Sequence, residues 1–436
     1  MKEQFLIGAA TAAHQVEGNN TNSDIWALEH MKYGGYPEKS GAAADHYHRY
    51  QEDITLLKEA GLNAYRFSLE WARIEPVEND FDEKEMQHYI DVIQYCLDND
   101  IEPVITLFHF SSPKWLIEKG GWESEYVVEA FARYTKYVCN HLSHIPIRII
   151  CTINEANMGN LISIFIRQAR EQRRLRGEDE AAAVQIGLDV EAMADDNTEK
   201  IKENRKVFGV DEPAVFVSPR TDTGNQIVMD AHRRAVEIIH KMLPDTKAGL
   251  SLSLRDVQWI PEGEERAKQD WYEEFEQFLP VIATDDFLGV QNYTRTRFGA
   301  EGELPPEEGM ELTQMGYEFY PQGLEHVLRR VHEAYKGDLV VTENGIATDD
   351  DTRRVAFIEK ALAGVRNCIN DQIPVKGYLY WSLMDNYEWQ SGYAMQFGLM
   401  GVDRKTQERM IRPSLTYLGE YAEGSRGDSK GTQDLG

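Results

Sequence analysis

The chain has 436 residues, of which 42% are hydrophobic and 28% are charged. That is long enough for a large buried core and argues against wholesale disorder. Its formal net charge is -28, from 74 acidic and 46 basic side chains. Because such a chain repels phosphates, a nucleic-acid partner and an anionic membrane surface are disfavoured, and neutral or cationic ligands remain.

Cysteine usage and the N-terminal sequence both bear on location. The four cysteines, at positions 96, 139, 151 and 368, form no CxxC pair. This favours free thiols in a reducing compartment over disulfides. The first residues lead almost directly into strand-like sequence without the apolar run of a signal peptide, and no stretch approaches about 18 apolar residues. We therefore expect a cytoplasmic protein with no membrane segment, and homo-oligomer formation stays open.

Short apolar stretches alternate with segments of helical periodicity along the chain. The predicted strands are 5–10, 64–69, 103–109, 147–153, 247–253, 287–293, 339–342 and 375–382. The clearest predicted helices are 47–61, 85–99, 127–142, 226–242, 323–335 and 353–370. This alternation is typical of parallel βαβ units, and eight such units close a barrel. The rival, an open doubly wound sheet, would be expected to carry a glycine-rich phosphate turn, which we do not find.

The sequence thus predicts an α/β protein, a single (β/α)8 TIM barrel with loop insertions at its C-terminal face. The barrel domain is expected to span residues 1–420. Residues 421–436 are small and polar, which predicts a flexible C-terminal tail. Residues 162–207 are rich in charged side chains, alanine and helix formers but match no pattern that we can place, and 300–316 form a Gly/Pro/Glu-rich loop.

Two predicted strands end on a glutamate. The stretch 339–345, LVVTENG, places Glu343 where an apolar strand gives way to an Asn-Gly turn. The stretch 147–155, IRIICTINE, ends on Glu155 in the same way. Because the carboxyl ends of parallel strands meet at one face of a barrel, the two carboxylates would face each other across its mouth. Cleavage of a glycosidic bond needs that arrangement.

Polar and aromatic residues recur at the other strand ends. In chain order they are Gln15, Arg66, His109, Asn154, Gln291, Tyr293 and Trp381. A single such residue is more often a cap or a solvated side chain than a catalytic group. Their coincidence at the face where barrel enzymes carry out chemistry favours an active site.

Four motifs resemble those of glycoside hydrolase family 1, the retaining β-glycosidases. They are YRFSLEWARI at 65–74, TINE at 152–155, VTENG at 341–345 and YWSLMDNYEW at 380–389. The resemblance implies hydrolysis of terminal non-reducing β-D-glycosidic bonds with retention, by double displacement through a covalent glycosyl-enzyme intermediate. β-Glucosides are the favoured substrates, with β-galactosides and β-fucosides as further candidates. The resemblance implies a small-molecule carbohydrate substrate, with no cofactor and no metal.

The resemblance also assigns roles to residues of this chain. Glu343 resembles the nucleophile and Glu155 the acid/base. Arg66 and Tyr293 resemble the groups that keep Glu343 charged and oriented, and Asn154 resembles the donor to the sugar 2-hydroxyl. The residues that resemble the remaining sugar contacts are Gln15, His109, Glu388 and Trp389, with Trp381 as the apolar floor.

Two positions depart from the family pattern. Many members carry a tryptophan directly after the histidine of the third strand, where this chain has Phe110. Phenylalanine lacks the indole N–H, so one hydroxyl contact is expected to be missing or replaced. The family's Asn-Tyr-Tyr after the sixth strand is Gln291-Asn292-Tyr293 here, and we align Tyr293 with the second tyrosine.

The sequence gives less support to two alternative functions. A 6-phospho-β-glycosidase would need cationic groups near the sugar 6-position, but the loop 388–396 contains Glu388 and no lysine. A catalytically dead sugar-binding scaffold predicts loss of one carboxylate, and both are present. The histidines of 45–48 (DHYH) suggest a metal site less than structural packing. Trp115 and Trp122 are equally compatible with the leaving-group cleft and with packing beneath a loop.

Overall fold

The computed structural model describes residues 4–176, 184–185, 188–189 and 198–431. Its centre is a ring of parallel strands in the order β7-β4-β3-β2-β1-β14-β13-β10-β8. The strands are β1 (Leu6–Ala10), β2 (Ala64–Ser68), β3 (Glu102–Phe108), β4 (Ile149–Ile153), β7 (Lys247–Gly249), β8 (Ser251–Ser253), β10 (Phe287–Gln291), β13 (Asp338–Asn344) and β14 (Val375–Trp381). The predicted TIM barrel is confirmed.

β7 and β8, the first and last strands in this order, belong to one stretch of chain. β7 pairs with β4 and β8 pairs with β10, and only Leu250 separates β7 from β8. The predicted fifth strand, 247–253, is therefore divided in two and bridges the two edges of the sheet. An eight-unit barrel thus closes through a break in its fifth strand.

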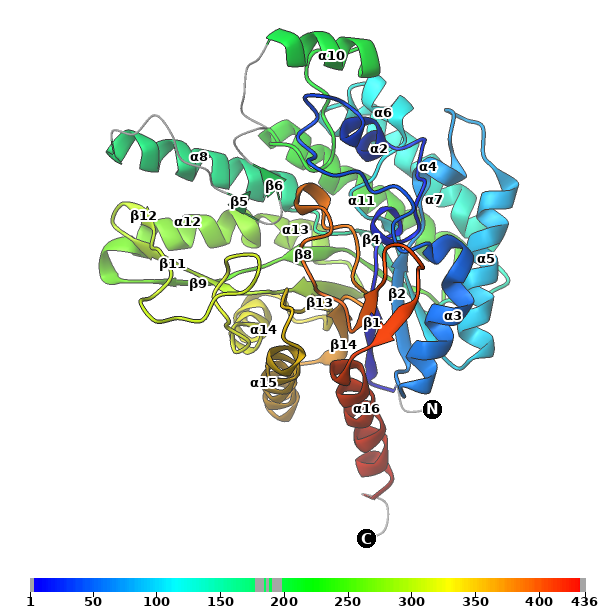
Figure 1. The fold of residues 1–436 in the computed structure, drawn as a ribbon, viewed down its shortest axis with the longest axis vertical. Coiled ribbons are helices and arrows are strands. Elements are labelled where there is room, and N and C mark those ends of the chain that lie inside the picture. The colour runs from blue at the N-terminus through cyan, green and yellow to red at the C-terminus, as the bar shows by residue number, and fades with distance from the viewer. Residues whose placement is uncertain (1–3, 177–183, 186–187, 190–197, 432–436) are drawn as a thin grey trace.

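Helices surround the strands on the outside (Figure 1). The long ones around the barrel are α3 (His46–Glu59), α5 (Glu83–Asp98), α7 (Tyr126–Leu142), α11 (Asp222–Met242), α14 (Gly323–Ala334) and α15 (Asp351–Asn370). Several begin where a side chain caps the first free N–H groups, as Asp82 does for α5, Thr221 for α11 and Asp350 for α15. The hydrophobic stripe of each helix is buried against the barrel, which explains the helical periodicity of the sequence.

Each barrel strand is buried on both faces, so its sequence is apolar rather than alternating. Inside the ring, Leu6, Val104, Phe287, Val340 and Leu379 come from different strands and pack together in one cluster. The close approach of β1 and β2 requires a glycine at position 8, because a Cβ there would lie 1.9 Å from the carbonyl oxygen of Ala64.

The insertions at the C-terminal end of the barrel hold the remaining elements. A three-stranded sheet of β9 (Asp256–Trp259), β11 (Arg295–Gly299) and β12 (Gly302–Glu303) lies beside α8 (Met158–Arg176) and α12 (Glu264–Glu274) (Figure 1). The rest are α10 (Thr198–Phe208), the hairpins β5 (Val184–Gln185)–β6 (Leu188–Asp189) and β15 (Met400–Val402)–β16 (Arg409–Ile411), and the short helices α1 (Ala13–Val16), α2 (Asp24–Glu29), α4 (Trp71–Ile74), α6 (Lys114–Glu118) and α13 (Leu279–Ile282). Part of the unplaced segment 162–207 is thus α8 and α10, and its middle lies largely outside the described residues.

The C-terminal segment contains the last described helix, α16 (Pro413–Gly431). This helix includes 421–431 of the segment for which a flexible tail is predicted, and 432–436 lie outside the described residues. Leu415, Leu418 and Ala422 anchor the start of this helix in the core. Once a packed first part nucleates a helix, each further residue adds a hydrogen bond, so polar composition alone does not end it. Among the described helices, none has the length and apolarity needed to cross a membrane.

Candidate active site

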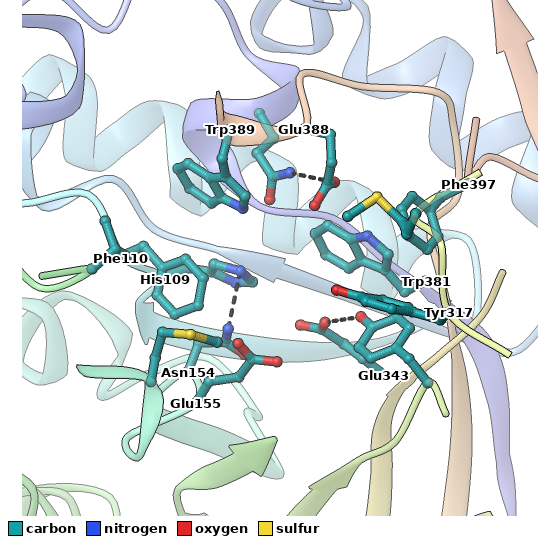
Figure 2. Close-up of a pocket in the computed structure, with 15 residues that line it drawn as sticks. His109, Phe110, Asn154, Glu155, Tyr317, Glu343, Trp381, Glu388, Trp389 and Phe397 are labelled. Atoms are coloured by element: carbon teal, nitrogen blue, oxygen red, sulfur yellow. Dashed lines mark hydrogen bonds between the residues drawn. The ribbon is translucent and has the colours of Figure 1, made fainter. Parts of the chain in front are cut away.

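The two predicted glutamates lie at the C-terminal end of the barrel. Glu343 belongs to β13, and Glu155 follows β4 by two residues. Both are buried and both line one cavity, which we call the sugar cavity (Figure 2). All ten predicted site residues except Arg66 are among its lining residues, and Arg66 lies directly behind Glu343.

Glu343 is held by two donors. Arg66 Nη1 donates to Glu343 Oε1 at 2.6 Å, and the Tyr293 hydroxyl donates to Oε2 at 2.5 Å. Burial raises the pKa of Glu343, while the Arg66 charge and the Tyr293 hydrogen bond oppose that rise. These two contacts favour the ionised carboxylate and fix the direction of both its oxygens.

Glu155 has a different environment. Burial, followed by the negative charge of Glu343, raises its pKa well above the ordinary value, and a hydrogen bond with Ser253 opposes that rise. Its backbone N–H donates to Ser251 Oγ at 3.1 Å. No guanidinium group donates to the Glu155 carboxylate among the described contacts. Of the two glutamates, Glu155 is therefore the one that holds a proton more readily.

Asn154 links Arg66, which contacts Glu343, to His109 on the cavity wall. Its Oδ1 accepts from Arg66 Nη2 at 2.5 Å, from Gln291 Nε2 at 2.8 Å and from Ser251 Oγ at 3.1 Å. Its Nδ2 donates to His109 Nε2 at 3.1 Å. With Oδ1 occupied by three donors, the second proton on Nδ2 remains for a ligand.

His109 presents a donor to the cavity. Burial and the Arg66 charge lower the pKa of His109 well below its ordinary value, which favours the neutral ring. Because Nε2 accepts from Asn154, the single ring proton belongs on Nδ1. Within the described part of the chain, that buried Nδ1 has no hydrogen-bond partner. An unpartnered buried donor in a cavity wall is what a sugar hydroxyl would satisfy.

Gln15 and Glu388 form a second polar group on the wall. Gln15 Nε2 donates to Tyr387 O at 2.9 Å and to Glu388 Oε2 at 3.3 Å. Gln15 Oε1 is buried and lacks a partner among the described residues. Burial and the nearby Glu343 charge raise the pKa of Glu388 to about 8. This wall therefore offers oriented donors and acceptors rather than a fixed charge.

Aromatic rings make up the rest of the wall. The His109 ring stacks near Trp381, with centroids 5.7 Å apart, and lies 6.4 Å from the Trp389 ring (Figure 2). Phe110, the departure from the family pattern, also lines the cavity and packs against Trp389 at 5.3 Å. Flat apolar faces between polar groups suit the apolar faces of a pyranose ring.

Three cavity residues have left-handed backbone. The φ angles are +68° at Phe110, +42° at Glu155 and +43° at Trp389. Non-glycine residues are uncommon in this region, and such strain gathers where the surrounding structure dictates a side-chain direction. At these positions the backbone directs the side chains of Phe110, Glu155 and Trp389 into the sugar cavity.

Several lining residues were not predicted from the sequence. They are Met158, Val217, Met315, Tyr317 and Phe397. The two serines at the end of the divided fifth strand were also missed, although Ser251 and Ser253 both contact the site. Small hydroxyl residues at alternating positions of a barrel strand end are the one signal that could have indicated them.

The two ambiguous tryptophans pack in the core. Trp122 is buried, donates to Ser112 Oγ at 3.0 Å and contacts the Phe108 ring. Trp115 donates to Glu75 O at 2.8 Å. Neither is among the residues that line the sugar cavity.

The DHYH segment also has structural partners. His46 contacts Asp53 at 2.7 Å and the Tyr65 hydroxyl at 3.0 Å. In the part of the chain that the structure describes, no cluster of three or more histidine, cysteine, aspartate or glutamate side chains could hold a metal ion.

This chain is similar to known proteins both in sequence and in structure. The family model for glycosyl hydrolase family 1 matches residues 1–168 and 283–426. A β-glucosidase of an Agrobacterium species is 30% identical, with 96% of this chain and 95% of the relative covered. The crystal structure of the β-glycosidase BGL167 is 42% identical with a TM-score of 0.87, covering 98% of this chain and 97% of its own.

A relative with a different printed activity also matches. A 6-phospho-β-galactosidase of Lacticaseibacillus casei is 26% identical, with 97% of this chain and 98% of the relative covered. Relatives of both printed activities match nearly the whole chain, so likeness to relatives does not choose between them. The family model covers well over half of the chain, and the barrel, the paired glutamates and the motifs agree with it: the chain belongs to glycosyl hydrolase family 1.

Proposed function

We propose that this glycoside hydrolase cleaves terminal non-reducing β-D-glucosides with retention, and β-galactosides and β-fucosides as further substrates. One observation carries the proposal. In a single cavity, Arg66 and Tyr293 donate to Glu343 and favour its ionised form, while the pKa of the neighbouring Glu155 is raised well above its ordinary value. A nucleophile that stays ionised and an acid that stays protonated are the two groups that double displacement needs.

In the first step, Glu343 attacks the anomeric carbon as the bond to the leaving oxygen breaks. Glu155 gives its proton to that oxygen, so the aglycone departs as a neutral alcohol. The sugar is left as an ester of Glu343. The 2-hydroxyl oxygen would accept a hydrogen bond from Asn154 Nδ2, a contact that strengthens as positive charge develops on the ring.

In the second step, Glu155 changes role. Esterification removes the negative charge of Glu343, and that charge is one of the causes that raise the pKa of Glu155. The pKa of Glu155 therefore falls, and its carboxylate can take a proton from water. The water attacks the anomeric carbon from the side that the aglycone left, which restores the β configuration.

The sugar cavity offers matched partners for an uncharged sugar. Gln15 Oε1 would accept from a hydroxyl, His109 Nδ1 would donate to one, and Glu388 would accept from others. Trp381 and Trp389 would contact the ring faces. A site with so many oriented groups rejects analogues that lack a hydroxyl, because its own polar groups are then left unpaired.

The alternative, a 6-phospho-β-glycosidase, has less support. Among the described residues that line the sugar cavity, none is a lysine or an arginine. Arg66 is engaged by Glu343 and Asn154. A phosphate would lie in this buried wall without a compensating cation, so hydrolysis of an unphosphorylated sugar is favoured. A dead sugar-binding scaffold is disfavoured because both carboxylates are present in distinct environments.

We place the enzyme in the cytoplasm. The support is that all four cysteines are buried and free of disulfides, as a reducing compartment favours. Homo-oligomer formation stays a prediction that light scattering of the full chain would check.

The decisive experiment uses Glu343→Ala with a dinitrophenyl β-glucoside, with and without azide. We expect activity to fall by several orders of magnitude and azide to restore turnover, with α-glucosyl azide as product. The matched variant is Glu155→Ala, for which azide should give the β-glucosyl azide, because the nucleophile still works. Full activity in Glu343→Ala, or the same azide anomer from both variants, would contradict the proposed roles.

A further inference from the structure

A second cavity adjoins the sugar cavity on the side of Glu155. It has a volume of about 280 Å³, and we call it the outer cavity. The residues that line both cavities are Glu155, Tyr293, Met315 and Tyr317. Because the acid/base delivers its proton to the leaving oxygen, the group attached to that oxygen would occupy the outer cavity.

The walls of the outer cavity are largely apolar. Leu161 and Phe165 contribute one wall from the first turns of α8. Leu304, Pro305 and Pro306 contribute another from the segment after β12. Pro305 and Pro306 are exposed, so a ligand there would remove apolar surface from water and gain affinity from it.

The first cation in this cavity, Arg255, is already neutralised. Its Nη2 donates to Asp270 Oδ2 at 2.5 Å, its Nε donates to Glu274 Oε1 at 2.6 Å, and Glu303 lies 3.8 Å from Nη1. The guanidinium also stacks over the Phe165 ring, 4.8 Å from the centroid. Arg255 therefore braces the apolar wall rather than offering a charge.

The other two cations are paired as well. Arg295 donates from Nε to Glu318 at 2.5 Å, from Nη2 to Glu307 at 3.0 Å and from Nη1 to Gln258 at 3.1 Å. Arg297 pairs with the second oxygen of Glu307 at 2.9 Å. Carboxylates outnumber guanidinium groups around this cavity, so it does not attract an anion.

The hydroxyl groups nearest the cleavage point are also engaged. Ser253 hydrogen-bonds the Glu155 carboxyl, and Thr294 Oγ1 donates to Glu318 O at 3.0 Å. A second sugar would bring several hydroxyls to this wall, where Thr296 Oγ1 is the one buried side-chain oxygen without a hydrogen-bond partner among the described residues. This one hydroxyl cannot pair with all of them. Burying those hydroxyls without partners would weaken its binding.

We infer that the outer cavity selects an apolar, uncharged leaving group, a hydrophobic alcohol or phenol, over a second sugar or an anionic group. The inference rests on the proposed glucosidase function and adds the class of aglycone to it. Leu161, Phe165 and Leu304 are the residues that would determine this preference.

The test compares three glucosides with the wild-type enzyme. 2-Phenylethyl β-glucoside and cellobiose differ in the outer-cavity group, and β-glucosyl fluoride leaves that cavity almost empty. A simple alcohol is no better a leaving group than a sugar hydroxyl, so a preference for it reports contacts in the cavity. We expect kcat/KM for 2-phenylethyl β-glucoside to exceed that for cellobiose about tenfold or more.

The possible outcomes distinguish the inference about the leaving group from the proposed glucosidase function. Turnover of the fluoride together with equal or higher kcat/KM for cellobiose overturns the inference and leaves the glucosidase function in place. Failure to hydrolyse the fluoride, with folded enzyme, overturns the proposed function itself.

Two leucines of the same loop region supply matched variants. Leu304→Ser should lower the ratio of kcat/KM for 2-phenylethyl β-glucoside over cellobiose about fivefold to tenfold, because it makes a wall of the outer cavity polar. Leu312→Ser is the control, since Leu312 is 43% exposed and is not among the lining residues. Leu161→Asn tests the opposite wall should Leu304→Ser misfold. Equal ratios in the control and in both wall variants would overturn the inference.

Discussion

At the scale of single residues, the site depends on giving two similar carboxylic acids different environments. Glu343 has a guanidinium and a phenol as donors, whereas Glu155 has a serine and the repulsion of Glu343. Burial alone would raise the pKa of both. The difference between them therefore comes from the direct hydrogen bonds of Arg66 and Tyr293 to Glu343 and from the Glu343 charge beside Glu155.

Tyr293→Phe tests this assignment. The Tyr293 hydrogen bond lowers the pKa of Glu343, so its loss raises that pKa. Because the nucleophile must be ionised, the acidic limb of the kcat/KM profile should move to higher pH, and activity on the acidic side should fall about tenfold or more. The measurement is kcat/KM from pH 4 to 9 on an aryl glucoside.

Tyr134→Phe serves as the control for that profile. Tyr134 is also buried and donates to Leu107 O at 3.1 Å, outside the sugar cavity. Its removal costs a buried hydrogen bond without touching Glu343. If both variants shift the acidic limb equally, or neither does, Tyr293 does not set the ionisation of Glu343.

At the scale of elements, the barrel strands were predictable because each is a short apolar stretch bounded by turn residues. The predicted strand 339–342 falls within β13, and 375–382 overlaps β14 (Val375–Trp381). Sequence patterns also indicated which face of the barrel carries the site, because polar and aromatic residues coincide at many strand ends, whereas a single one would be weak evidence.

Other elements could not be predicted for physical reasons. The break at Leu250 depends on which neighbours the two halves of the fifth strand pair with, and this information is absent from the strand itself. Met315 and Tyr317 reach the site from an irregular loop, which has no periodicity to analyse. The helical continuation through 421–431 depends on packing at Leu415 and Leu418, earlier in the same helix.

Close contact between strands gives a prediction at this scale. Gly8→Ala in β1 would place a Cβ 1.9 Å from Ala64 O, a backbone atom that cannot move freely. We expect the free energy of unfolding to fall by about 1–3 kcal/mol or more. Urea denaturation followed by circular dichroism would measure it.

Gly424→Ala in α16 is the matched control. A Cβ there would meet no atom within 4 Å, and alanine favours a helix more than glycine. Its free energy of unfolding should be unchanged or rise by up to about 1 kcal/mol. Equal losses in the two variants would show that strand contact is not the cause.

At the scale of the whole molecule, several buried carboxyl groups couple stability to pH. Burial raises the pKa of Asp24 to about 7 and that of Glu70 to about 8. A carboxyl whose pKa is raised in the folded state stabilises the fold while protonated. That stability is present below the unfolded pKa, near 4, and is lost as the pH rises through the folded pKa.

Asp24→Asn isolates one such group. Asp24 Oδ1 accepts from the N–H groups of Ile25 and Ser112 at 2.7 and 2.9 Å, contacts that an amide oxygen can retain. Relative to wild type, the variant should gain about 2–4 kcal/mol of unfolding free energy between pH 4 and pH 8. The readout is urea denaturation at several pH values.

Asp245→Asn provides the comparison for charge removal at an exposed position. A gain for Asp24→Asn that does not grow with pH, or that Asp245→Asn reproduces, would show that the buried carboxyl is not responsible.

The left-handed backbone at Phe110, Glu155 and Trp389 limits how this enzyme can be improved by laboratory evolution. Glycine or asparagine would relieve the strain at each position, at the cost of a ring, an acid or an indole. A library selected for heat resistance alone would therefore enrich inactive sequences at these three codons. Selection for turnover must accompany selection for stability, or these positions must be held constant.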